Sequence, residues 1–232
     1  MKVDAILWDY DGTLVNSAPK NMEITKEILS VVAPRLTGAG LPYCLQDEAV
    51  YHIANHQAKN WQDLYLNYYG MTEEEMFAAG PLWTEHQLRS LIPVDLFPEV
   101  EEVIRQIDLP QGICSQNSAA GITRILEKHN IIHKFSSIVG YTDIPVHLQK
   151  PAANAGIRCL AEIFPGASDK TVFYVGDHEG DVQFARNIQR ELKENIKVIS
   201  VAVTYSGANT GAWQEQPDFE IEQPGGLLKL ID

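Results

Sequence analysis

Short apolar runs alternate with helical patterns along most of the chain. The runs expected to form strands are residues 3–8, the QGIC segment ending at Cys114, and residues 137–139, 171–175 and 198–203. Several are β-branched and apolar at consecutive positions, as strands are when both faces of a sheet are covered. Between them, helical patterns cover residues 100–107, 119–129, 152–163 and 181–192. This alternation predicts an α/β fold with a doubly wound parallel sheet.

One long segment breaks the alternation of strands and helices. Residues 16–93, inserted after the first strand, carry a mostly helical pattern that is rich in Trp and Tyr and contains no convincing strand. A segment of this length is too long for a loop inside a compact domain. We therefore expect an α/β core formed by residues 1–15 and 94–232, and a helical cap formed by residues 16–93.

Composition and charge narrow the classes of function. The chain has 232 residues, 45% of them hydrophobic, and a net charge of −13 from 18 Lys and Arg against 31 Asp and Glu. A globular protein with this charge repels nucleic acid and anionic membranes, so we expect neither as a partner. The three widely spaced cysteines and the lack of a signal-peptide pattern favour the cytoplasm. The oligomeric state has no signal in the sequence.

Polar clusters directly follow three of the expected strands. They are Asp9-Tyr10-Asp11, Ser115-Gln116-Asn117 and the run from Gly176 to Asp181. Ligands of open parallel sheets bind beyond the carboxyl ends of the strands, so these clusters are expected at one edge, which Lys150 can also reach. Several carboxylates with a single lysine need a further cation there. Oxygen-rich surroundings favour a hard cation, and Mg²⁺ is the natural candidate.

The same residues form four motifs in a fixed order. DYDGT covers Asp9 to Thr13, Ser115 follows the ICS strand, Lys150 lies in KPAAN, and GDHEGD ends at Asp181. In this pattern the chain resembles the haloacid dehalogenase superfamily, in its phosphoglycolate phosphatase-like branch with a helical cap. The segments LVNSAP and LFPEVEEVIRQI extend the likeness over essentially the whole chain. Dehalogenases lack the second Asp of the first motif, so Asp11 argues against that activity.

The resemblance implies a role for each catalytic candidate. Asp9 would attack phosphorus and form an aspartyl-phosphate. Asp11 would donate a proton to the leaving alkoxide and then accept one from the hydrolytic water. Ser115 would donate a hydrogen bond to a phosphoryl oxygen, and Lys150 would stabilise charge on the transferred group.

The resemblance also implies a metal site and no organic cofactor. Mg²⁺ would be held by Asp9, by the backbone carbonyl of Asp11 and by Asp177. Asp181 would support the metal-bound waters or the lysine, although its place at the start of a helix is equally consistent with a role at that helix N-terminus. Asn117 or Ser118 is expected to cap the helix that follows the second motif.

The leading hypothesis is a Mg²⁺-dependent phosphatase that hydrolyses a small phosphorylated metabolite through an aspartyl-phosphate, with phosphoglycolate suggested by the resemblance. In this hypothesis the cap closes to exclude water and select the substrate. One alternative is a phosphomutase or phosphotransferase, in which a second substrate replaces water as the acceptor. Another is a protein without catalysis, either a phospho-Asp receiver or a silent binding protein. All four motifs are intact, which favours an enzyme.

Overall fold

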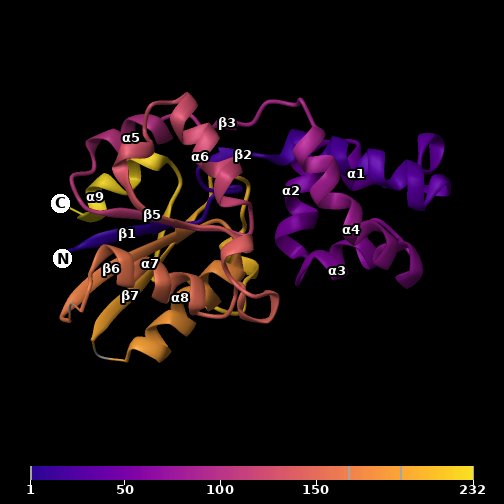
Figure 1. Cartoon of the computed structure of the whole chain (residues 1–232). Helices are drawn as coiled ribbons and strands as arrows, with labels where there is room; N and C mark the ends of the chain where they lie inside the picture. Colours follow the sequence, from indigo (N-terminus) through magenta and orange to yellow (C-terminus); the bar gives the residue numbers. More distant parts are fainter. Residues whose placement is uncertain (1, 167, 194, 232) are drawn as a thin grey trace. The chain divides into compact units, whose positions relative to one another are not determined.

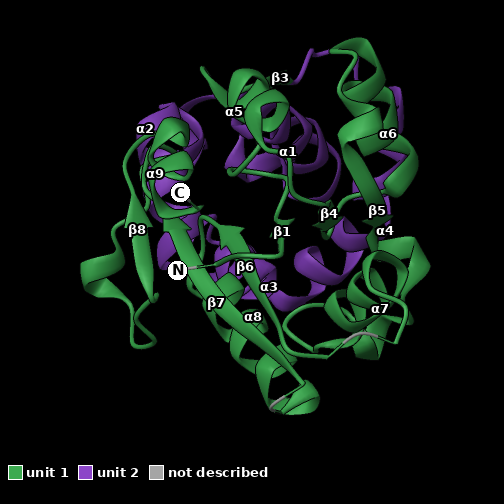
Figure 2. Ribbon diagram, turned by 90° about the vertical axis from the view of Figure 1, so that its left-hand side faces the viewer, with its two compact units in different colours: residues 1–16, 95–232 green, residues 17–94 purple. Residues whose placement is uncertain are grey.

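The chain divides into two compact units in a computed structural model, which describes residues 2–166, 168–193 and 195–231. The first, here called the core unit, comprises residues 1–16 and 95–232. The second, the helical insert, comprises residues 17–94 (Figure 2). Each unit has its own hydrophobic core, so each is described by itself.

A parallel sheet forms the centre of the core unit (Figure 1). Its order is β5-β4-β1-β6-β7-β8, and every neighbouring pair is parallel. The strands are β1 (Ala5–Trp8), β4 (Gln111–Cys114), β5 (Phe135–Val139), β6 (Lys170–Gly176), β7 (Ile196–Val203) and β8 (Phe219–Ile221). The first five correspond to the apolar runs of the sequence, and the predicted α/β class is confirmed. The sequence pattern missed β8.

Helices cover both faces of this sheet. On one face lie α7 (Asn154–Ile163) and α8 (Glu179–Leu192), and on the other lie α5 (Val100–Gln106), α6 (Ala119–Lys128) and α9 (Leu228–Ile231) (Figure 2). Leu7 and Tyr174 of the sheet are fully buried against Leu160 of α7 and Phe184 of α8. Because β4 and β6 both run parallel to β1, the carboxyl ends of these three strands reach one edge of the sheet.

A short antiparallel ribbon lies where the chain passes between the two units. It consists of β2 (Val15–Asn16) and β3 (Asp95–Leu96), with Val15 opposite Leu96 and Asn16 opposite Asp95. The backbone N–H of Phe97 extends the pairing by donating to the carbonyl of Leu14 at 3.0 Å. The ribbon therefore holds the two ends of the insert side by side.

The helical insert packs α1 (Ala18–Val32), α2 (Glu48–Gln57), α3 (Trp61–Asp63) and α4 (Glu73–Arg89) around its own core. A π-helical turn, Leu64–Tyr68, continues α3. Thr72 and Glu75 form a capping box that starts α4. Residues 17–94, all of which the structure describes, contain no strand.

Single 3-10 turns complete the secondary structure; they are Pro34–Leu36, Gly38–Gly40 and Tyr43–Leu45 in the insert, and Ile132–Lys134, Tyr141–Asp143, Val146–Leu148, Thr210–Ala212 and Pro224–Gly226 in the core unit. Among the described residues, no helix has both the length and the apolar character that crossing a membrane requires.

Candidate active site

The loop after β1 carries the two carboxylates of the first motif. The backbone N–H of Asp9 still pairs with the carbonyl of Val175 in β6 at 2.8 Å, so the chain leaves the sheet only beyond this residue. The loop then turns tightly, because the carbonyl of Tyr10 accepts the N–H groups of both Leu14 and Val15. Gly12 has a φ of +78°, a backbone conformation that glycine adopts without strain. Asp9 is thereby fixed at the end of β1 and is only 8% exposed.

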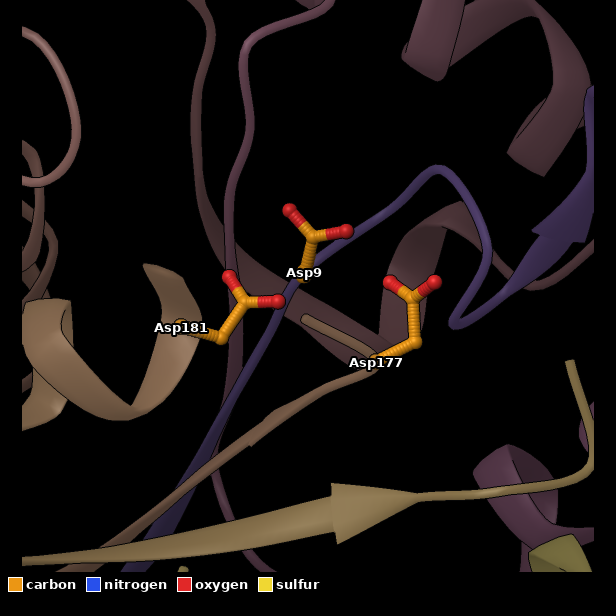
Figure 3. Close-up of side chains that lie close together, drawn as sticks. All are labelled: Asp9, Asp177 and Asp181. Carbon is orange, nitrogen blue, oxygen red and sulfur yellow. The ribbon is translucent and has the colours of Figure 1, made fainter. Parts of the chain in front are cut away.

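Three carboxylates gather at the carboxyl edge of the sheet (Figure 3). Asp9 follows β1, Asp177 follows β6, and Asp181 lies in the first turn of α8. One oxygen from each lies within 4.8 Å of the other two. The sequence placed these residues at one edge, and the structure brings them together.

The ammonium group of Lys150 neutralises part of this charge. Its Nζ donates to Oδ1 of Asp9 at 2.7 Å and to Oδ1 of Asp181 at 2.6 Å. The same atom lies 5.2 Å and 5.3 Å from the ring centres of Tyr174 and Phe184, a cation–π arrangement. Burial lowers the pKa of Lys150. The carboxylates of Asp181 and Asp9 together raise it by more than burial lowers it, so the pKa lies above its ordinary value. Lys150 is therefore charged at neutral pH.

The negative charge that Lys150 leaves on the three carboxylates is suited to binding a metal cation. Burial raises the pKa of Asp9 well above its ordinary value, Lys150 opposes that rise, and the carboxylates of Asp181 and Asp177 add to it. The close cluster sets three carboxylates against the single ammonium group of Lys150. A donor set made only of carboxylate oxygens suits a hard divalent cation and offers no ligand that a soft metal would prefer. The cluster could hold such an ion.

Asp181 makes both of the contacts that the sequence left as alternatives. Its Oδ2 accepts the backbone N–H of His178 at 3.1 Å, which completes the capping box of α8. Its Oδ1 accepts from Lys150 and also from the hydroxyl of Tyr174 at 3.4 Å. Asp181 is 6% exposed, and these donors satisfy its carboxylate inside the protein. The residue therefore both caps its helix and orients the lysine.

A loop that the sequence analysis did not single out supports Asp177. The hydroxyl of Ser206, beyond β7, donates to Oδ2 of Asp177 at 3.4 Å, and the hydroxyl of Thr13 donates to Oδ1 at 3.3 Å. The hydroxyl of Tyr205 donates to the carbonyl of Thr13 at 2.6 Å. The signal was present, because Thr204-Tyr205-Ser206 follows a predicted strand just as the other three clusters do.

The loop after β4 begins with Ser115 and places Asn117 beside Asp11. The Oγ of Ser115 accepts the backbone N–H of Asn117 at 3.0 Å. The expected helix cap is Ser118, whose Oγ accepts the N–H of Gly121 at 3.2 Å. Asn117 instead turns its side chain to Asp11, with Nδ2 3.1 Å from Oδ2. Asp9, Asp11, Ser115, Lys150, Asp177 and Asp181 thus all come from loops or helix starts at one edge of the core unit.

A match to a known family accompanies this arrangement of acidic residues and a lysine at the edge of a parallel sheet. The family model of the haloacid dehalogenase-like hydrolases matches residues 6–192 of the chain. The chain belongs to this family and is an enzyme of the hydrolase class. Within the family it is phosphoglycolate phosphatase-like, and the resemblance expected from the motifs is confirmed.

Individual relatives give the extent of the similarity. A phosphoglycolate phosphatase from Synechococcus elongatus is 28% identical over 237 residues, covering 99% of this chain and 97% of its own. A phosphoglycolate phosphatase from Chromobacterium violaceum is 24% identical and covers 90% of this chain and 89% of its own. The crystal structure of a predicted phosphoglycolate phosphatase from Haemophilus somnus has a TM-score of 0.71 at 21% identity, covering 100% of this chain and 99% of that one. This last likeness concerns the fold alone.

Proposed function

We propose that this enzyme is a Mg²⁺-dependent phosphatase that hydrolyses a small phosphorylated metabolite through an aspartyl-phosphate intermediate. The observation that carries the proposal is the pairing of Asp9 with Lys150. Asp9 is the carboxylate nearest the end of β1, and its Oδ1 accepts from the Lys150 ammonium group at 2.7 Å. The ion pair opposes the rise in the pKa of Asp9 that burial causes, and so favours the ionised carboxylate that an attack on phosphorus requires.

The residues around Asp9 supply the other requirements of the reaction. A phosphate monoester carries negative charge that repels a carboxylate, so the site needs positive charge and alignment. Lys150 provides the charge, and we assign to Ser115 a hydrogen bond to a phosphoryl oxygen. Asp11, two residues beyond the nucleophile, donates a proton to the leaving alkoxide. It then takes a proton from the water that hydrolyses the intermediate.

We propose that Asp9, the backbone carbonyl of Asp11 and Asp177 hold the Mg²⁺ ion. The all-oxygen donor set and the excess of carboxylate over lysine support this assignment. When bound, the ion supplies positive charge to the phosphoryl group and to the nucleophile. Thr13 and Ser206 keep the Asp177 carboxylate in one orientation through their hydroxyl groups.

Phosphoglycolate is the first substrate to test, because the two curated relatives carry the name phosphoglycolate phosphatase. We propose that the helical insert serves as the cap that selects the substrate. Its position in the chain supports this, since it begins four residues beyond Thr13 of the first motif. Cys44, Cys114 and Cys159 are buried free thiols, which supports a reducing compartment such as the cytoplasm.

The test measures phosphate release from p-nitrophenyl phosphate and from phosphoglycolate, in Mg²⁺ and in chelator. The wild-type protein should release phosphate in Mg²⁺ and not in chelator, and Asp9→Asn should release none in either. Substrate labelled with ³²P and quenched in acid should leave label on the wild-type chain and none on Asp9→Asn. Phosphate release in chelator would refute the requirement for a metal. Phosphate release by Asp9→Asn would refute the assignment of Asp9 as the nucleophile.

The same experiment separates hydrolysis from transfer. A phosphomutase or phosphotransferase would release little phosphate until a second sugar phosphate was added, and the label would then move to that acceptor. If the folded protein bound Mg²⁺ but neither released nor transferred phosphate from any compound in a panel of phosphorylated metabolites, a binding role would replace the proposal.

A further inference from the structure

Asn117 forms hydrogen bonds to both the second motif and the second carboxylate of the first motif. Its backbone N–H donates to Oγ of Ser115 at 3.0 Å, and its carbonyl accepts the N–H of Tyr141 at 3.0 Å. Its side-chain Oδ1 accepts the N–H of Ser118 at 2.8 Å. Its Nδ2 lies 3.1 Å from Oδ2 and 3.4 Å from Oδ1 of Asp11. Both ends of the side chain therefore have hydrogen-bond partners.

The partner of Oδ1 determines which end of the amide faces Asp11. The N–H of Ser118 can only donate, so the atom of Asn117 that meets it is the carbonyl oxygen. The NH₂ group then points at the Asp11 carboxyl, and it too can only donate. Asn117 thus occupies an acceptor position on Asp11 and fixes where that carboxyl lies, without removing the carboxyl's capacity to carry a proton elsewhere.

We propose that Asn117 is a positioning residue that holds the Asp11 carboxyl for proton transfer to the leaving group; this inference rests on the proposed function. In that step a bond forms between a carboxylate oxygen of Asp9 and phosphorus while the ester P–O bond breaks. The electron pair of the broken bond stays on the ester oxygen, which takes the proton from Asp11. Because the Asn117 amide only donates, the proton of Asp11 sits on a lone pair that does not face Asn117.

Leaving groups of different acidity test this role. p-Nitrophenolate leaves as a stable anion, phenolate needs more help, and an alkoxide needs a proton most. We therefore compare kcat and kcat/KM on p-nitrophenyl phosphate, phenyl phosphate and ethyl phosphate. For Asn117→Ala we expect a loss within about 3-fold on the first probe and of about 10- to 100-fold on ethyl phosphate, with phenyl phosphate between them.

Two further variants separate the positioning role from the stability of the loop. Asn117→Asp keeps an oxygen for the N–H of Ser118 but has no donor for Asp11, so it should show the same dependence on the leaving group. Ser118→Ala removes the cap of α6 and leaves Asp11 untouched, so any change should be equal on all three probes. Circular dichroism and urea unfolding establish that each variant is folded.

Equal losses on the three probes, or no loss on any of them, would overturn the role of Asn117. If Asn117→Ala failed to fold, equal losses or no loss on the three probes in Asn117→Asp would overturn the role by themselves. Failure of the proposed function looks different, because wild-type protein would then hydrolyse none of the probes in Mg²⁺. An active wild type with an unchanged leaving-group profile in the variants leaves the phosphatase in place and removes only the inference about Asn117.

Discussion

Replacing Gly12 with alanine should displace the carboxylate of Asp177. A Cβ built on Gly12 would lie 2.6 Å from Cγ and 2.8 Å from Oδ1 of Asp177, closer than the 3.0 Å below which Cβ contacts essentially never occur. The obstructing atoms belong to a short side chain held by the hydroxyl groups of Thr13 and Ser206. Asp177 must therefore move, and it loses both hydrogen bonds when it does.

The cost of Gly12→Ala has two parts. Alanine at a φ of +78° costs about 1–2 kcal/mol through the backbone alone. Each hydrogen bond to a charged group contributes about 1.5–3 kcal/mol, and the lower end applies because these two measure 3.3 and 3.4 Å. The sum is about 4–5 kcal/mol. Gly70 is the matched control, because its φ is +73° and a Cβ added there would meet nothing within 4 Å, so Gly70→Ala should lose only the backbone part.

Urea unfolding in chelator measures both variants, and calorimetric titration with Mg²⁺ measures what the displacement does to the metal site. Gly12→Ala should lose about 3 kcal/mol more than Gly70→Ala. It should also bind Mg²⁺ more weakly, so that the gap between the variants widens in Mg²⁺. Equal losses in the two variants, together with wild-type Mg²⁺ affinity in Gly12→Ala, would refute the reasoning.

Three further predictions concern the core unit. Gln111→Leu leaves the buried indole N–H of Trp8, which donates to Gln111 at 3.0 Å, without its partner, and should cost about 1–3 kcal/mol in urea unfolding. For Asp218, burial raises the pKa but Arg186 and nearby donors lower it more, so the pKa lies below 3.8. Stabilisation from a lowered pKa is present above the unfolded-state pKa and is lost as pH falls through the folded pKa. Asp218→Asn should therefore be less stable than wild type at about pH 7, and the difference should shrink as the pH falls below 3.8. Mg²⁺ at about 100 times its Kd should raise the free energy of unfolding by about 2.7 kcal/mol, and Asp177→Asn should abolish most of that gain at the same concentration.

The central strands could be predicted because burial on both faces leaves a mark in the sequence. All four residues of β1 are buried, and the pattern of consecutive apolar residues identified it. The edge strand β8 has only three residues, two of them exposed, and pairs with β7 alone. The ribbon of β2 and β3 has two residues on each side. Such short pairings depend on tertiary contacts that no local pattern encodes.

The candidate site could be predicted as far as it depends on strand ends. Asp9, Ser115 and Asp177 each follow an apolar run, and topology alone brings them to one edge. The direction of the Asn117 side chain was not predictable, because it depends on an acceptor 106 positions away in the chain. Helix-cap preference favoured Asn117 and Ser118 alike, and the fold used only Ser118 for that purpose.

The ribbon of β2 and β3 has a consequence for how such enzymes diversify. Val15 opposite Leu96 and Asn16 opposite Asp95 place both ends of the insert at neighbouring positions. The entropic cost of closing a loop between fixed ends rises only slowly with the length of the loop. A junction of this kind therefore tolerates inserts of very different sizes. Recombination at the ribbon can exchange one insert for another without shifting the register of the sheet. With the insert in its proposed role as the cap, such an exchange would change substrate selectivity and leave the residues at the carboxyl edge of the sheet in place.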